Sequence, residues 1–384
     1  MGLKRILILS EAVGAGHERA AQALARGLHE TYPAVECRVI NTGQYLNPWL
    51  EKLFVKAYLE TLQLTPELWG FLYGLTQKNG QPARVKNFLG KLYMAKLKKL
   101  LFTYRPDFVI CTHPFPCNAM SAIKEQGHNV PTAAIVTDFN IHSLWVQHNL
   151  EAYLVGSQEI KDRLIENGIE PIRIHVTGIP INPAFATPKN IVCIKRTIGL
   201  TEKPVLLVMG GGLGVGRLTE IIRLLDQAPI DAQVVAIAGK NQALKEELDY
   251  LADRLTKPLW VFGYVSNVEE FMVAADLIIT KPGGLTSAEA LAVGLPMVLV
   301  NPLPGQEEYN CRFLVEKGAA VMASTPNSVP RIVTTLLREP DKMMRMRQNA
   351  LALGRPAAGL DAAKLIMKMS SRKPYLYARE ACSG

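Results

Sequence analysis

Short apolar runs alternate with longer amphipathic stretches along the first part of the chain. Ile6–Leu9 precedes a helical spacing of apolar positions over Glu18–His29, and a second apolar run follows at Val35–Ile40. Phe108–Cys111 and Ala133–Val136 continue the series. Strands that alternate with helices are typical of a parallel sheet with helices on its faces. The pattern therefore predicts an α/β domain.

The same alternation starts again near residue 205. The predicted strands are Val205–Met209, Val234–Ala238, Trp260–Phe262, Leu277–Thr280 and Met297–Val300, and the predicted helices are Leu218–Asp226, Gln242–Arg254 and Ser287–Val293. We interpret this series as a second α/β unit of the same kind. The chain is thus predicted to form two Rossmann-like domains with a cleft between them.

A stretch without periodicity separates the two series. Thr177-Gly-Ile-Pro-Ile-Asn-Pro-Ala-Phe is dense in Gly and Pro, as connections between domains are. We expect an N-terminal domain over residues 1–185, a C-terminal domain over 186–365, and a helix end with a basic tail over 366–384.

Composition supports two globular domains and narrows the location of the protein. The 384 residues are 48% hydrophobic and 20% charged, and the net charge of +9 favours anionic partners. Six cysteines lack the paired spacings of a zinc site, which favours a reducing, cytoplasmic location. No apolar run approaches the roughly 20 residues of a spanning helix, so membrane contact is expected to be peripheral.

The strongest single motif is Lys281-Pro-Gly-Gly-Leu-Thr-Ser-Ala-Glu-Ala-Leu, which follows a predicted strand and opens a predicted helix. Glycines at such a point let backbone N–H groups approach an anion, and the helix N-terminus adds partial positive charge. A diphosphate is therefore expected here without a metal ion. A second interpretation stays open, because Thr286 and Glu289 also have the spacing of a capping box, in which Glu289 only satisfies backbone donors.

Two further glycine clusters follow predicted strands. Gly210-Gly-Gly-Leu-Gly-Val-Gly lies in the second domain, and Gly14-Ala-Gly-His follows the first strand. The second cluster puts His17 at a helix start on the carboxyl edge of the sheet, where ligands of open α/β folds bind. Asp138 and His142 follow another strand and are expected at the same edge, where either could orient or assist His17. A lone histidine at a helix start is also compatible with an ordinary polar surface residue.

Hydrogen-bonding side chains are dense in Pro302–Asn310. They suit a polyhydroxylated sugar as well as an ordinary solvated loop.

Aromatic residues interleave with Lys and Arg between Trp49 and Arg105, and no acidic residue occurs between Lys78 and Arg105. This pattern favours docking on anionic lipid. It also suits nucleic acid, but no nucleic-acid-binding motif accompanies it, so lipid is preferred.

Together these motifs resemble those of bacterial processive diacylglycerol glucosyltransferases and plant monogalactosyldiacylglycerol synthases, relatives of the peptidoglycan lipid-linked N-acetylglucosaminyltransferase. The resemblance covers nearly the whole chain. Its motifs are Gly14-Ala-Gly-His17 with Ala20-Ala21, Thr137-Asp-Phe with His142 and Trp145, Pro282-Gly-Gly-Leu-Thr-Ser-Ala-Glu289, Gly294-Leu-Pro, and Pro304-Gly-Gln-Glu-Glu-Tyr-Asn310.

The resemblance implies a GT-B fold and an inverting transfer of a hexose from a UDP-sugar to a lipid hydroxyl, most simply that of diacylglycerol. Glu289 would bind the ribose, the backbone at Tyr264 and Val265 would read uracil, and His17 would act as base or contact the acceptor. The candidate catalytic residues are His17, Asp138 and His142; the candidate donor-binding residues are Gly16, Gly211, Gly212, Tyr264, Val265, Pro282, Gly283, Gly284, Leu285, Thr286, Glu289, Gln306, Glu307 and Asn310. Plant enzymes carry an acidic residue near the first glycine loop, where this chain has Glu11.

The resemblance makes the UDP-sugar a substrate and implies no cofactor. The sequence contains no Asp-x-Asp, so a metal-bridged diphosphate is not expected. A nicotinamide oxidoreductase would have an acidic residue after the second strand, where this chain has Asn41 and Thr42. Two alternatives remain open: a UDP-sugar epimerase of the same fold, and a non-catalytic UDP-sugar-binding regulator. The expected partners are a UDP-sugar, a lipid acceptor and an anionic membrane surface, namely the inner face of the cell membrane.

Overall fold

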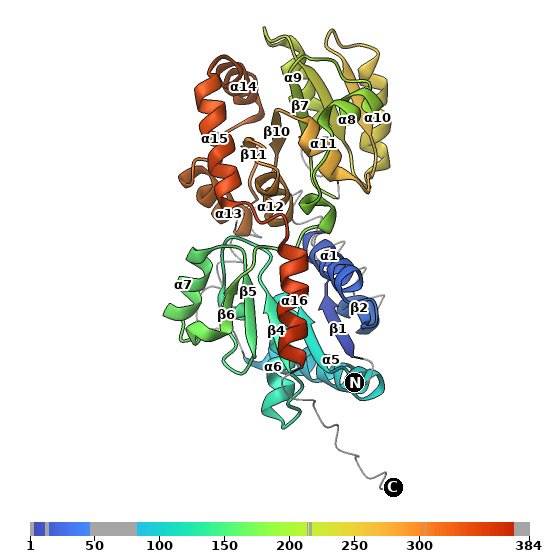
Figure 1. The fold of residues 1–384 in the computed structure, drawn as a ribbon, viewed down its shortest axis with the longest axis vertical. Coiled ribbons are helices and arrows are strands. Elements are labelled where there is room, and N and C mark those ends of the chain that lie inside the picture. Colours follow the sequence, from blue (N-terminus) through green and yellow to red (C-terminus); the bar gives the residue numbers. More distant parts are fainter. Residues whose placement is uncertain are drawn as a thin grey trace. The chain divides into compact units, whose positions relative to one another are not determined.

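The computed structural model describes residues 4–11, 15–46, 83–212, 214, 217–303 and 305–371, which form two compact units. Unit 1 takes the described residues of Met1–Thr137, Ile141–Asn182 and Ala358–Gly384. Unit 2 takes those of Asp138–Asn140 and Pro183–Ala357. In Figure 1 each unit is a sheet flanked by helices.

Unit 1 contains a six-stranded parallel sheet in the order β2-β1-β3-β4-β5-β6. Its strands are β1 (Arg5–Ser10), β2 (Glu36–Asn41), β3 (Phe108–Cys111), β4 (Thr132–Ile135), β5 (Ala152–Val155) and β6 (Ile174–Val176). Its helices are α1 (Ala15–Thr31), α2 (Thr42–Leu46), α5 (Ala83–Tyr104), α6 (Pro114–Glu125), α7 (Gln158–Glu166) and α16 (Ala358–Ser370), with short 3-10 turns η1 (Ser143–Trp145) and η2 (Pro171–Arg173). The central strands are mostly apolar and almost entirely buried because helices cover both of their faces.

Unit 2 repeats this plan with the order β12-β11-β10-β7-β8-β9. Its strands are β7 (Val205–Met209), β8 (Gln233–Ile237), β9 (Leu259–Phe262), β10 (Leu277–Thr280), β11 (Met297–Val300) and β12 (Ala320–Ala323). Its helices are α8 (Ile191–Ile198), α9 (Leu218–Gln227), α10 (Gln242–Ala252), α11 (Val268–Ala274), α12 (Gly284–Ala292), α13 (Gln306–Glu316), α14 (Val329–Arg338) and α15 (Pro340–Leu353), with η3 (Pro183–Ala186) and η4 (Pro326–Ser328). Two Rossmann-like parallel sheets confirm the fold class that the alternating pattern predicted.

The last described helix belongs to unit 1, although it follows all of unit 2 in the chain. α16 packs beside α1, as Figure 1 shows, and Ala362, Ala363 and Ile366 are fully buried in the core that surrounds Leu24. A Cβ atom on Gly27 would lie 2.6 Å from the carbonyl oxygen of Gly359, so glycine permits the close contact. The chain therefore crosses between the units near Asn182 and returns near Ala358.

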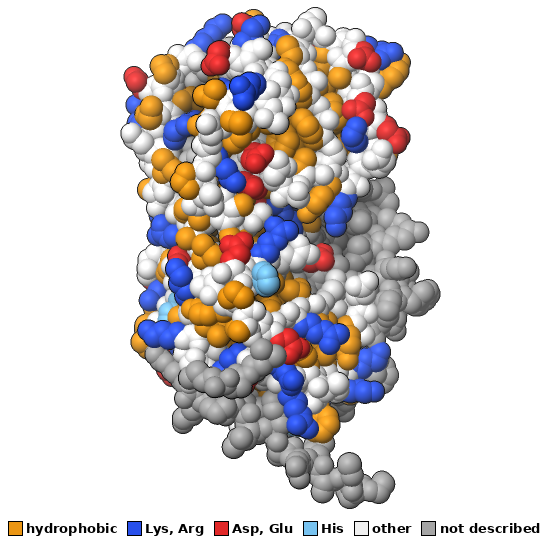
Figure 2. All heavy atoms as spheres, turned by 45° about the vertical axis from the view of Figure 1, so that its right-hand side comes forward, with side chains coloured by type: hydrophobic (Ala, Val, Ile, Leu, Met, Phe, Trp, Pro, Cys, Tyr) orange, Lys and Arg blue, Asp and Glu red, His pale blue; other side chains and the backbone are white. Residues whose placement is uncertain are grey.

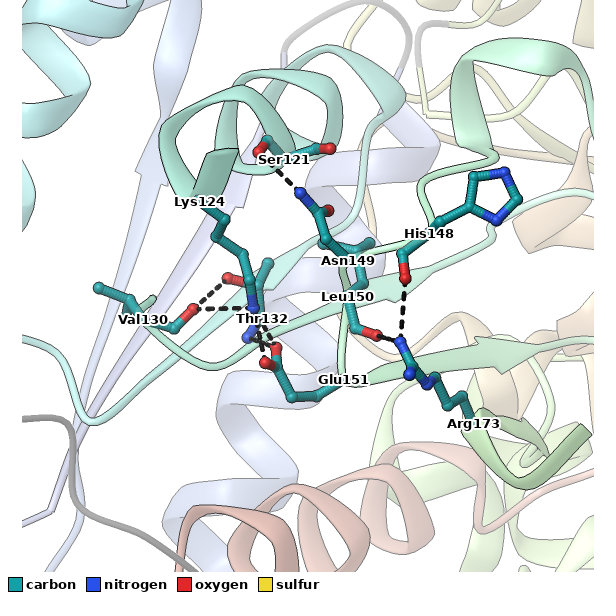
Figure 3. Close-up of polar contacts among 9 residues, drawn as sticks. All are labelled: Ser121, Lys124, Val130, Thr132, His148, Asn149, Leu150, Glu151 and Arg173. Carbon is teal, nitrogen blue, oxygen red and sulfur yellow. Dashed lines mark hydrogen bonds and ion pairs between the residues drawn. The ribbon is translucent and has the colours of Figure 1, made fainter. Parts of the chain in front are cut away.

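A partly buried ion pair fixes the amino ends of β4 and β5 (Figure 3). Nζ of Lys124 lies 2.6 Å and 2.7 Å from the two carboxylate oxygens of Glu151, and the Thr132 backbone N–H donates to the same carboxylate. Arg173 donates to the carbonyl oxygens of His148 and Leu150 beside it. These groups lie at the strand starts, so the carboxyl edge of the sheet is left to the residues described next.

Candidate functional site

The strand order of unit 2 reverses between β7 and β10. β8 and β9 are added on one side of this pair, and β11 and β12 on the other. In open α/β sheets ligands bind at the carboxyl ends of the strands beside such a switch point. The segments that follow these two strands are the glycine turn that begins at Gly210 and the start of α12, and both were singled out by the sequence.

The start of α12 leaves backbone donors uncapped. The helix begins at Gly284 with Gly283 as its N-cap, and no side chain accepts a hydrogen bond there. The first N–H groups of a helix have no partner within it, and they attract anions. A Cβ atom on Gly283 would meet nothing within 4 Å, so packing within the described protein does not demand glycine at this position. Close approach of a ligand is a physical reason for it.

The capping-box interpretation of Glu289 is wrong. It requires Thr286 to lie outside the helix, but α12 begins two residues before Thr286. Glu289 therefore lies in the second turn, and its side chain is 1% exposed. A carboxylate so placed has no role in capping the helix start.

The glycine turn after β7 is shaped by close backbone contacts. Gly211 and Gly214 have positive φ angles of 72° and 60°. A Cβ atom on Gly214 would lie 2.0 Å from the carbonyl oxygen of Ala238, and the Gly212 carbonyl accepts from the Lys240 N–H at 3.1 Å. Gly214 is thus required by the packing of two turns against each other. A Cβ atom on Gly211 would instead lie 3.7 Å from Cε of Lys281, at the end of β10.

The start of α13 holds Gln306, Glu307 and Asn310. Glu307 forms an ion pair with Lys281, with Nζ and Oε1 2.6 Å apart, and its second oxygen accepts from the Leu303 N–H. Asn310 is fully buried within unit 2. Its amide donates to the Pro282 carbonyl oxygen and to Asp138, and accepts from the Phe139 N–H. The amide of Asn310 thus fixes the segment that leads into α12.

The expected uracil-reading segment follows β9. Tyr264 is exposed, Val265 is half-buried, and the ammonium of Lys240 lies 5.7 Å from the centre of the Tyr264 ring. Both residues lie at the carboxyl edge of the sheet, on the side of β7 that carries β8. Unit 2 therefore gathers its candidate donor-binding residues along one sheet edge.

Unit 1 has its own switch point between β1 and β3, and His17 lies there. Nδ1 of His17 lies 2.8 Å from the carbonyl oxygen of Thr112, directly after β3, and 2.8 Å from the Thr137 hydroxyl, after β4. A carbonyl oxygen only accepts, so Nδ1 must carry the proton. The lone pair of the neutral ring is then on Nε2, as a general base requires.

Two more histidines surround His17. The His113 ring lies edge-on to the His17 ring with centres 4.6 Å apart, and its Nδ1 accepts from the Phe115 N–H. Burial, reinforced by His17 and His142, holds the pKa of His113 well below its usual range. Burial and then His17 lower the pKa of His142 to about 4. Both rings are therefore neutral near pH 7.

The sequence interpretation missed His113, Thr112 and the hydroxyl of Thr137. The signal was available, because Thr112 and His113 directly follow the apolar run Phe108–Cys111. Asp138, expected beside His17, groups with unit 2 and accepts from Asn310. Gly16 is half-buried, and a Cβ atom there would meet nothing within 4 Å.

Glu11 follows β1 and is 5% exposed. Its carboxylate accepts from the Thr42 hydroxyl and, at 3.0 Å, from the Gly43 N–H. These contacts place Glu11 at the start of α2, where a negative charge is favoured by the helix dipole. Glu11 thus stabilises the start of α2, which directly follows β2.

Comparison with solved structures identifies the fold. MurG of Acinetobacter baumannii is 15% identical, with 96% of this chain and 100% of that chain covered and a TM-score of 0.64. The UDP-GlcNAc 2-epimerase of Neisseria meningitidis, solved with UDP-GlcNAc bound, is 14% identical, with 95% and 100% covered and a TM-score of 0.58. These similarities confirm the GT-B fold.

Sequence comparisons identify the family. The model of monogalactosyldiacylglycerol synthase matches residues 17–181, and that of the glycosyltransferase family 28 C-terminal domain matches residues 205–365. The processive diacylglycerol beta-glucosyltransferase of Bacillus subtilis (strain 168) is 34% identical over 352 residues, which cover 90% of either chain. The resemblance seen in the motifs is thereby confirmed, and this chain is a glycosyltransferase that belongs to the family of the processive diacylglycerol beta-glucosyltransferases.

Proposed function

We propose that the protein transfers glucose from UDP-glucose to the hydroxyl of diacylglycerol, with inversion at the anomeric carbon. The names of the similar glucosyltransferases support glucose and diacylglycerol. The structural observation that carries the proposal is His17, whose Nδ1 is held by the Thr112 carbonyl. Nε2 is thus a base with a fixed orientation, as proton removal from an acceptor hydroxyl demands.

In the proposed step, the acceptor hydroxyl gives its proton to Nε2 of His17 while its oxygen bonds to the anomeric carbon. The bond from that carbon to the β-phosphate oxygen breaks, and its electron pair leaves with UDP. Backbone N–H groups at Gly284 and Leu285 stabilise the new negative charge, without a metal ion. The leaving group departs with both of its phosphates.

The other donor contacts follow the carboxyl edge of unit 2. Glu289 accepts from the ribose hydroxyls, and the backbone at Tyr264 and Val265 reads the uracil edge. Gln306 and Glu307 bind the glucosyl hydroxyls. Asp138 has a supporting role because it accepts a hydrogen bond from Asn310. His142 has one because it interacts electrostatically with His17.

Membrane contact belongs to the proposal as well. No helix in the described part of the chain is long and apolar enough to span a bilayer. At the end of α5, Lys96 and Lys99 are exposed, while Leu97 and Leu100 are buried in the core of unit 1. This end of the helix offers charge to anionic lipid, together with the exposed ring of Phe102. The aromatic residues Trp49–Tyr73 lie outside the described residues.

On the face shown in Figure 2, basic and acidic side chains are interspersed instead of forming one large basic patch. The described cysteines are all free thiols, which agrees with a reducing compartment. We therefore place the protein at the cytoplasmic face of an anionic membrane, bound peripherally.

The direct test incubates purified protein with labelled UDP-glucose, UDP-galactose or UDP-N-acetylglucosamine and diacylglycerol vesicles. Label from UDP-glucose should enter the organic-soluble fraction, and a His17→Ala variant should leave it in water. An epimerase would convert free UDP-sugar without acceptor, and a regulator would bind it without turnover. Either result would contradict the proposal.

A further inference from the structure

Lys281 occupies the centre of the proposed donor-binding edge of unit 2. It directly follows β10 at the switch point of unit 2, and its Cε is the atom nearest to a Cβ placed on Gly211. Its ammonium lies 2.6 Å from Oε1 of Glu307. Lys281 thus lies between the glycine turn after β7, the uncapped start of α12 and the start of α13.

The pairing with Glu307 poses an electrostatic problem for donor binding. A carboxylate beside a diphosphate repels it, and the repulsion is strong where water is partly excluded. The Glu307 side chain is 13% exposed, and its second oxygen accepts from the Leu303 N–H. Glu307 is therefore held in place by the backbone, whereas Lys281 carries its charge on a flexible stem that can turn elsewhere.

We infer that the Lys281 ammonium exchanges Glu307 for the β-phosphate when the donor binds, and that Glu307 then accepts hydrogen bonds from the glucosyl hydroxyls. Without donor, the two side chains neutralise each other. When the donor is bound, the Lys281 ammonium stabilises the negative charge that develops on the departing UDP, as the backbone amides of α12 do. The inference rests on the proposed function, because it assumes a UDP-sugar at this edge.

The alternative is that Lys281 and Glu307 form a permanent structural ion pair. The two models predict opposite effects of Glu307→Gln on UDP binding. In a structural pair, Lys281→Gln and Glu307→Gln remove the same contact, so both should lower stability and weaken UDP binding alike. In the exchange, Glu307 competes with the phosphate for one ammonium. Removing the carboxylate should then favour UDP, while removing the ammonium should disfavour it.

The experiment measures dissociation constants by titration calorimetry for UDP, UMP and UDP-glucose. Lys281→Gln should weaken UDP binding by about 10- to 100-fold, the range for hydrogen bonds to charged groups, and UMP binding much less. Glu307→Gln should bind UDP as tightly as wild type or more tightly, and should lose affinity for UDP-glucose relative to UDP. Lys281→Arg, which keeps the charge, should retain most of the UDP affinity.

Lys203→Gln is the matched control, because Lys203 pairs with Asp231 at 2.7 Å elsewhere in unit 2. It should leave all three constants unchanged. Melting temperatures identify a variant that fails to fold, and if Lys281→Gln does so, Glu307→Gln then carries the test. Parallel weakening of UDP binding in Lys281→Gln and Glu307→Gln would overturn the exchange while the proposed function stands. A wild-type protein that binds no UDP would overturn both.

Discussion

Nδ1 of His17 lies 2.8 Å from the carbonyl oxygen of Thr112, a contact that joins the first helix of unit 1 to the end of β3. The carbonyl fixes which ring nitrogen carries the proton, so the lone pair of the neutral ring is on Nε2. Burial and the neighbouring His17 lower the pKa values of His113 and His142, so both of these rings are neutral near pH 7.

His17→Ala should lower the turnover number by about 100-fold or more, because general base catalysis contributes this much. The UDP dissociation constant should stay the same, since the proposed nucleotide contacts belong to unit 2. Steady-state kinetics and calorimetric titration check both values. Thr137→Val, which removes only the hydroxyl beside Nδ1, should give a smaller loss. Full activity in His17→Ala would remove this histidine from the mechanism.

Glu289→Gln should weaken UDP binding by about 10-fold or more, since the ribose would lose a charged acceptor. The melting temperature should change little, because the variant keeps the volume of the side chain. Binding of 2′-deoxy-UDP supplies the control: it lacks one ribose hydroxyl, so the substitution should weaken its binding less. Equal weakening for both nucleotides would contradict a ribose contact.

Stability should fall as the pH drops from about 6.5 to about 4, because an unfolded histidine titrates near the upper value. The folded His142 has a pKa of about 4, so the unfolded state binds more protons between these values. Above pH 6.5 the contribution of neutral His142 to the free energy of unfolding is fully present, and at pH 4 about 3 kcal/mol of it is lost. His113, whose pKa is also depressed, adds to the loss.

Urea unfolding at pH 7.5, 5.5 and 4.5 tests this dependence. His142→Asn should flatten the profile of unfolding free energy against pH, while some slope from His113 remains. The exposed His29, in the last turn of α1, provides the control, and His29→Gln should keep the wild-type slope. An unchanged slope in His142→Asn would contradict the assignment.

Replacing Lys96 and Lys99 with Gln should reduce binding to anionic vesicles by roughly 10-fold or more, since each basic residue near such a surface contributes about 1 kcal/mol. Added salt should weaken the wild type in the same way. Vesicle sedimentation measures both effects. Lys195→Gln and Lys203→Gln, a pair of lysines in unit 2, serve as the charge-matched control. Equal loss in the control would indicate that net charge, rather than α5, determines docking.

Gly27→Ala should destabilise unit 1 by about 1 to 3 kcal/mol, because the new methyl group would overlap the Gly359 carbonyl and force the helices apart. Thermal unfolding measures the loss. Gln22→Ala, at an exposed position of the same helix, should have almost no effect. A neutral Gly27→Ala variant would show that α1 and α16 can separate at little cost.

The sequence by itself determined the two sheets and the segments at their carboxyl edges. β3, β7, β10 and β11 have the bounds that their apolar runs predicted, because a strand buried on both faces is apolar along its whole length. The glycine-rich turn after β7 was visible because the positive φ angles of Gly211 and Gly214 restrict residue choice. Strands β5, β6 and β12 were not named, since runs of three or four apolar residues also suit buried helices.

Only the tertiary structure decided which of these segments meet. The return of α16 to unit 1 depends on Gly27 and Gly359 approaching across more than 300 residues of chain, which no local pattern records. The orientation of His17 by Thr112, and the pairing of Lys281 with Glu307, likewise join residues from different strand ends. Periodicity reports which face of an element is buried, whereas strand order determines which strand ends become neighbours.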